Sequence, residues 1–168
     1  MCRAVAERRP GLGIDPATAA LAGLVHDWGR GEGGADAMLA AAARLGVEVS
    51  SAARRAPVAL LHAPVGAKSL CAHGLTDPGL LRAVANHTVG EAGMGPLELL
   101  VYTADFCEPG RTHPGAAEVR ALLERDLVGA ARLATRCTIE HLLRQGTLVE
   151  PGALALWNDL VTREDRSV

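Results

Sequence analysis

The sequence predicts a single all-α domain, and three observations carry this prediction. Proline follows a helix-capping residue where apolar patterns of helical period begin, as at Asp15-Pro16 and Asp77-Pro78. Phe, Trp and Tyr make up only 2% of the chain, so Ala, Leu and Val must fill the core, and that mixture favours closely packed helices. No segment alternates polar and apolar residues over the length of a strand. A chain of 168 residues can bury one core without disulfides or a structural metal, and we expect residues 1–168 to form one domain.

Each expected helix has a start or a stop in the sequence. Glycines at 46, 74 and 146 end three of them, and Ser50 caps a short helical turn. Pro64 is expected to separate two helices, because proline is tolerated in the first turn of a helix but not in its interior. The expected helices are Pro16 to Asp27, Ala35 to Leu45, a turn after Ser50, Pro57 to His62, Pro64 to His73, Pro78 to Asn86, Pro96 to the stop at Glu108-Pro109-Gly110, Asp126 to Gln145, and Pro151 to about Arg163.

Composition excludes several classes of protein. The net charge is only −2, so no nucleic-acid partner is expected, and no apolar run approaches the roughly 18 residues of a membrane span. The cysteines lie far apart at positions 2, 71, 107 and 137. This spacing, without a signal peptide, indicates reduced thiols rather than disulfides or a zinc ribbon. The sequence therefore predicts a cytoplasmic protein without a membrane partner, and its alanine-rich helical surface is compatible with a homodimer.

The adjacent pair His26-Asp27 is the first candidate site. It follows Leu24 and Val25 on a predicted apolar helix, where ionisable side chains need a partner. A metal ion is the economical partner, because an imidazole and a carboxylate can converge on one ion beside the helix. The glycines that follow would leave open space there. The alternative is a structural histidine beside a capping aspartate.

Further candidates fall at or near the ends of predicted helices. Asp105 lies on an apolar helix, where a carboxylate is costly to bury without a cation; the alternative is a hydrogen bond to a neighbouring segment. Arg111 carries the planar fork that binds phosphate oxygens, unless it is one more surface arginine. His62 and His87-Thr88 could donate hydrogen bonds to phosphate, although a lone histidine is more often structural. Such nitrogen and oxygen donors suit iron, manganese or zinc.

Several segments, in their order along the chain, carry a recognisable pattern: His26-Asp27, Leu60 to Ala67, His87 to Gly90 with Gly93-Met94, Tyr102 to Asp105 running into Glu108 to Arg111, and Thr138 to Leu143, with the region of Asn158 also similar. Together they resemble the YqeK-type bacterial HD-domain hydrolases. The His-Asp pair alone would indicate metal-dependent phosphohydrolases in general. The Leu-Leu-His-x-Pro-Val-Gly-Ala and Glu-Pro-Gly-Arg segments narrow the resemblance to this family.

The resemblance implies an HD-type helical bundle that hydrolyses diadenosine tetraphosphate symmetrically to two ADP. It implies a divalent or trivalent metal ion, with iron expected and manganese or zinc as alternatives. The implied metal ligands are His26, Asp27 and Asp105, of which the two aspartates are also catalytic and in contact with the substrate. The residues implied to hold the nucleotide phosphates are His62, His87, Thr88 and Arg111.

Two other functions stay open from the sequence. One is a different HD phosphohydrolase acting on a nucleotide or deoxynucleotide monophosphate, and the other is a catalytically impaired HD domain that binds nucleotide or a protein partner. The second has support because the family pattern includes a histidine upstream of the His-Asp pair, whereas the first histidine here is His26. We expect Arg3 to Arg9 to be the tail of the helix that carries that histidine, so that the first helix is truncated. With only Cys2 and Glu7 nearby as alternative ligands, we expect lowered metal occupancy, or an upstream in-frame start that restores the histidine.

Overall fold

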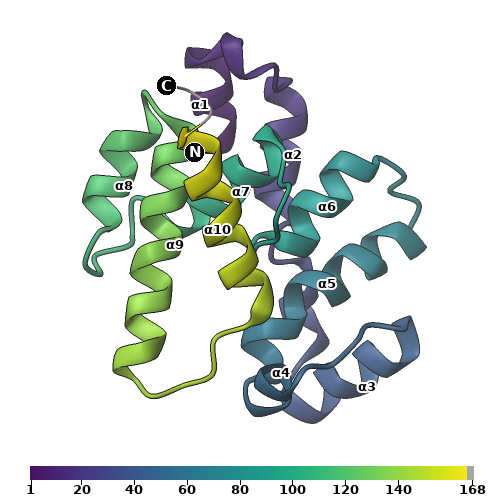
Figure 1. Cartoon of the computed structure of the whole chain (residues 1–168). Helices are drawn as coiled ribbons and strands as arrows, with labels where there is room; N and C mark the ends of the chain where they lie inside the picture. The colour runs from purple at the N-terminus through teal and green to yellow at the C-terminus, as the bar shows by residue number, and fades with distance from the viewer. Residues whose placement is uncertain (166–168) are drawn as a thin grey trace.

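The structure is a computed structural model that describes residues 1–165, and every regular element in this range is helical (Figure 1). The α-helices are α1 (Cys2–Arg8), α2 (Pro16–Val25), α3 (Ala35–Leu45), α4 (Ser51–Arg55), α5 (Pro57–Ala72), α6 (Pro78–Asn86), α7 (Pro96–Cys107), α8 (Ala116–Leu123), α9 (Leu127–Arg144) and α10 (Pro151–Asp165). Two short 3₁₀-helices are η1 (Pro10–Leu12) and η2 (Trp28–Glu32). The prediction of an all-α fold is confirmed. Among the described residues, no helix combines the length and the apolar character needed to cross a bilayer.

Several helices begin where their caps predict. Asp15 Oδ2 accepts a hydrogen bond from Thr18 N at 2.7 Å, and Asp77 Oδ1 accepts one from Leu80 N at 2.9 Å. Proline occupies the first helical position after both caps, and Ser50 caps α4 in the same way. These bonds satisfy backbone donors that have no partner inside the helix. The positions of these helices therefore follow from local chemistry.

The predicted break at Pro64 is wrong, because α5 runs through it without interruption. An interior proline removes one backbone hydrogen bond and costs about 3 kcal/mol or more. Close packing offsets that cost: α5 contacts α3, α6 and η2, and Ala63 and Val65 beside the proline are buried. Tertiary contacts thus override the local preference for a helix boundary.

The His-Asp pair lies at the end of a helix rather than on it, which corrects the predicted boundary. Helix α2 ends before His26, which is its C-cap, and Asp27 lies in the turn that leads into η2. Gly29 supplies the physical reason, because a Cβ atom at this position would collide with the carbonyl oxygen of His62. The turn therefore lies directly on the backbone of α5, which the chain reaches only by leaving α2. This close approach places Asp27 beside His62.

Helix α7 runs through the middle of the bundle (Figure 1). It contacts α6, α8 and α9, and the main buried cluster includes Leu100 and Tyr102 on this helix. A smaller buried cluster, with Met38, Leu61 and Val65, joins α3, α4 and α5. Helix α8 is absent from the sequence prediction, since it starts after glycine without a side-chain cap. The ends of α2 and α6 meet α5 and α7 between these two clusters.

Candidate metal and phosphate site

The predicted site residues come from separate segments and converge in the fold. His26 and His87 are the C-caps of α2 and α6, whereas His62 and Asp105 lie within α5 and α7. Asp27 Oδ1 is 3.2 Å from His62 Nε2 and 3.6 Å from His87 Nε2. His26 Nε2 is 3.7 Å from Asp27 Oδ2 and 3.8 Å from Asp105 Oδ1. The fold therefore brings all five side chains into one cluster.

Backbone carbonyl groups fix the orientation of all three imidazoles. The Nδ1···O distances are 2.8 Å for His26 with Gly23, 3.0 Å for His62 with Val58, and 2.7 Å for His87 with Val84. A carbonyl oxygen can only accept, so each Nδ1 must donate, and a neutral ring then has its lone pair at Nε2. This is the arrangement in which a histidine binds a metal ion through Nε2. Donation to phosphate from the same atom would instead require the protonated ring.

The polar atoms around Asp27 test whether a cation fits. His62 Nε2 and His87 Nε2 lie 3.1 Å apart, and two lone pairs at this distance repel unless a proton or a cation lies between them. Thr88 Oγ1 is 3.2 Å and 3.1 Å from these two nitrogens, but its hydroxyl has only one proton to donate. Asp27 Oδ1 is buried and accepts no hydrogen bond of good geometry from the described residues. Arg30 Nε approaches that oxygen at 2.7 Å as an ion pair without hydrogen-bond geometry. The donor set therefore fits a cation.

The grouping of the possible ligands differs slightly from the prediction. One ligand atom from each of His26, Asp27 and His87 lies within 4.8 Å of the other two. His87, predicted to hold phosphate, is thus also placed where it could hold a metal. Asp105, predicted as a ligand, lies at the edge of this group, next to His26.

The charge state of the cluster follows from these contacts. The imidazole of His87, followed by the guanidinium of Arg30, holds the pKa of the Asp27 carboxyl well below its usual range, although partial burial acts in the opposite direction. Burial lowers the pKa of His62, and the neighbouring His87 adds to that effect. An ionised carboxylate therefore faces a neutral imidazole, which is the protonation state that metal ligands require.

Two arginines line the cavity in front of this cluster. Arg111 Nη2 donates to Asp105 Oδ1 at 2.8 Å, and its side chain is 41% exposed, so part of the guanidinium remains accessible. The sequence analysis did not identify Arg30. We call this space the central cavity; it measures about 170 Å³ and is lined by Arg30, His87, Thr88, Tyr102, Asp105, Phe106, Arg111, His113 and Thr138.

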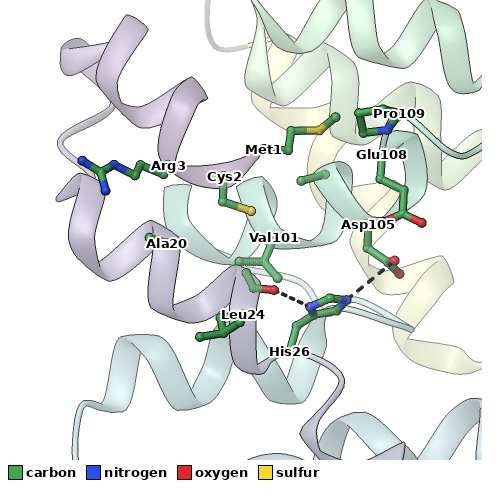
Figure 2. A pocket seen from close by; sticks show the side chains of 12 residues that line it. Met1, Cys2, Arg3, Ala20, Leu24, His26, Val101, Asp105, Glu108 and Pro109 are labelled. Atoms are coloured by element: carbon green, nitrogen blue, oxygen red, sulfur yellow. Dashed lines mark hydrogen bonds and ion pairs between the residues drawn. The ribbon is translucent and has the colours of Figure 1, made fainter.

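A second cavity, of about 380 Å³, is lined by His26 and Asp105 (Figure 2). Figure 2 shows His26 at its wall, between a backbone carbonyl and Asp105. Cys2 lines this cavity. Glu7, the other residue expected as an alternative ligand, instead pairs with Arg3 at 2.8 Å on the surface. Of the two, only Cys2 is therefore near the cluster.

The helical fold, together with imidazoles and carboxylates gathered from several helices, defines an HD-type domain, a class of hydrolases that uses a divalent metal. The chain is 37% identical over 106 residues to the symmetrical bis(5'-nucleosyl)-tetraphosphatase of Halalkalibacterium halodurans, which covers 62% of this chain and 57% of that protein. It is 39% identical over 104 residues to the Bacillus subtilis protein of the same name, covering 61% of this chain and 56% of that protein. It therefore spans less than two thirds of the length of these relatives. No family model matches the sequence.

A solved structure extends this likeness to nearly the whole chain. It is a crystal structure from Clostridium acetobutylicum, described as a predicted HD superfamily hydrolase involved in NAD metabolism. The two structures agree with a TM-score of 0.85 and 28% identity, over 96% of this chain and 84% of the other. The chain thus has the fold of the HD superfamily hydrolases. The resemblance stated from the sequence motifs is confirmed.

Proposed function

We propose that this protein is a metal-dependent phosphoanhydride hydrolase that cleaves diadenosine tetraphosphate symmetrically into two ADP. The observation that carries the proposal is the position of Arg111 and Thr88 in the same cavity as His87 and Asp105, two members of the cluster of imidazoles and carboxylates. Cation ligands and phosphate-binding donors are thereby placed side by side, as hydrolysis of a phosphoanhydride requires. The names of the relatives support the choice of substrate.

We assign His26, Asp27 and Asp105 as the metal ligands and iron as the metal, with manganese or zinc as the alternatives. The absence of thiolates among these ligands supports a borderline or hard ion. Such an ion, when bound, acts as a Lewis acid toward phosphate and lowers the pKa of water. The two aspartates then have a double role as catalytic groups, because they hold the cation and also face the reacting phosphates.

We assign the phosphate chain to Thr88 and Arg111 as donors, and His62 and His87, predicted for the same role, lie beside the Thr88 hydroxyl. The Thr88 hydroxyl and the Arg111 guanidinium supply hydrogen-bond donors, and a guanidinium can hold two phosphate oxygens at once. Arg111 currently pairs with Asp105, so it would share its remaining N–H groups with the substrate. Arg30 joins this set because it lines the same cavity.

Separation of the reaction products tests the proposal. The protein is loaded with Fe²⁺ under reducing conditions, incubated with diadenosine tetraphosphate, and the nucleotides are separated by anion-exchange chromatography. We expect ADP as the only product, because the central phosphoanhydride must face the cation. ATP and AMP in equal amounts would show an asymmetrical cut and refute the assignment. A chelator-treated sample serves as the control and should release no ADP.

The four cysteines, all described, are free thiols. This state supports a cytoplasmic location, where thiols stay reduced, and the proposed substrate is a small nucleotide rather than a nucleic acid.

A further inference from the structure

Two larger cavities adjoin the central cavity on different sides of α9. The first, which we call the Leu142 cavity, measures about 430 Å³ and shares Thr88 and Thr138 with the central cavity. The second, which we call the His141 cavity, measures about 470 Å³ and shares Phe106, His113 and Thr138 with it. Thr138 therefore lines all three cavities. The central cavity therefore shares part of its wall with each of the two larger spaces.

The sizes of the three cavities differ in a way that matches one kind of ligand. Pockets for small organic molecules usually have volumes of roughly 300 to 1,000 Å³, and both flanking cavities fall in this range. The central cavity, at about 170 Å³, is smaller, and its lining is charged. A compact anionic segment with a bulkier group at each end would fill this arrangement.

The His141 cavity carries the aromatic surface that a base requires. Phe106 is the only phenylalanine of the chain, and its ring centroid lies 4.5 Å from that of His113 in an edge-to-face contact. A hydrogen bond of 2.9 Å joins His113 Nε2 to the Phe106 carbonyl oxygen and fixes the position of the second ring. His141, from α9, adds a further imidazole to the wall. Stacking on such rings accepts any base, because every base has a π face.

We propose that the His141 cavity binds the second nucleoside of a dinucleoside polyphosphate, with Phe106 and His113 as its stacking platform. The phosphate chain then lies in the central cavity and the first nucleoside in the Leu142 cavity. This inference rests on the proposed function and deepens it. It explains how a single chain can place the middle of a four-phosphate bridge at its cation cluster, because each end of the substrate is held separately.

The test compares diadenosine tetraphosphate with adenosine 5′-tetraphosphate, which has the same phosphate chain and only one nucleoside. The wild-type enzyme should prefer the dinucleotide in kcat/KM by on the order of tenfold, since base stacking on an aromatic ring contributes about that much. Phe106→Leu, which keeps apolar volume but removes the ring, should abolish most of this preference. His141→Ala should reduce it as well; this exposed residue lines the His141 cavity and not the central one. His73→Ala is the matched control, because this exposed histidine lines none of the three cavities.

Binding of the product gives a readout that does not depend on turnover. Calorimetry with ADP on the metal-loaded protein should show two molecules bound per chain in the wild type and in His73→Ala, and one molecule in Phe106→Leu. Equal kcat/KM for the two substrates in the wild type, one bound ADP, or a preference that survives both variants would overturn the inference while leaving the hydrolase assignment intact. Failure of the wild type to cleave either compound would instead overturn the proposed function.

Discussion

Substitution of Gly29, which lies against α5, is the change whose effect on the fold and the site can be worked out most directly from the structure. A Cβ atom at Gly29 would lie 2.8 Å from Gly66 N and 2.9 Å from the carbonyl carbon of His62, and closer still to its oxygen. Non-bonded heavy atoms are normally at least about 3.5 Å apart, so the Gly66 N contact alone would require η2 to move away from α5 by roughly 0.7 Å, and the closer His62 carbonyl oxygen would require more. Overpacking costs about 1–3 kcal/mol, and backbone atoms cannot rotate away as a flexible side chain can. We therefore expect Gly29→Ala to destabilise the fold by about 3 kcal/mol.

Thermal unfolding followed by circular dichroism measures this effect. In a domain of this size, each kcal/mol lowers the Tm by about 2–4 °C, so Gly29→Ala should lower the Tm by roughly 6–12 °C. The displacement also separates Asp27 from His62, so metal content per chain should fall. Gly31→Ala is the matched control in the same 3₁₀-helix, since a Cβ there meets no atom within 4 Å, and its Tm should stay within a few degrees of the wild type. Equal unfolding temperatures for the two variants would refute the packing argument.

Three other outcomes follow from the site. Asp105→Ala should lose bound metal and lower the rate of hydrolysis by more than the roughly 10- to 100-fold typical of losing a residue that only supports a metal ligand, with an unchanged helical signal by circular dichroism. Asp36→Ala, at an exposed carboxylate of α3, is the control. Full activity of Asp105→Ala would make Asp105 structural. Arg111→Lys keeps the charge but loses the planar, two-pronged guanidinium. Because one hydrogen bond to a charged group contributes about 1.5–3 kcal/mol, kcat/KM should fall on the order of tenfold. Unchanged kinetics would place Arg111 outside the phosphate site. Burial raises the pKa of Cys107 to about 11, so iodoacetamide at pH 8 should alkylate the exposed Cys71 long before Cys107. Peptide mass spectrometry measures the labelling of each cysteine, and equal labelling would contradict the burial of Cys107.

Local chemistry explains which parts of the fold were predictable from the sequence. Aspartate caps followed by proline, and the serine cap of α4, mark helix starts through bonds within four residues, and such starts were placed correctly, as at Asp15 and Asp77. The break at Pro64 was predicted wrongly because the contacts that keep α5 continuous come from α3, α6 and η2. Helix α8 was missed for a related reason: Gly115 offers no side-chain cap, and the buried Val119 and Leu123 hold the helix through tertiary packing.

The candidate site likewise contains residues that the sequence indicated and residues that only the structure reveals. The sequence indicated His26, Asp27 and Asp105 because ionisable groups among apolar residues need partners, and the fold brings them together. It did not indicate Arg30, since nothing in its neighbours along the chain distinguishes it from other arginines. Phe106 was overlooked although it is the only phenylalanine of the chain, a rarity that could have been used as a signal. Its proximity to His113, seven residues later, depends on the turn after α7 and is visible only in the structure.

The histidines at the ends of α2 and α6 have two functions: each caps its helix, and each presents a ring nitrogen to the site. The last carbonyl groups of an α-helix have no partner further along the helix. His26 and His87 are C-caps, and each directs its Nδ1 to a carbonyl three residues earlier, in the last turn of its own helix. One hydrogen bond thus satisfies a backbone acceptor and at the same time selects the tautomer whose Nε2 lone pair faces Asp27. His62, inside α5, makes the corresponding bond to the carbonyl of Val58, in the first turn of its own helix. His26 therefore gains a defined ring orientation and tautomer from lying at the end of α2. The turn over α5 that ends this helix is thus part of what builds the site.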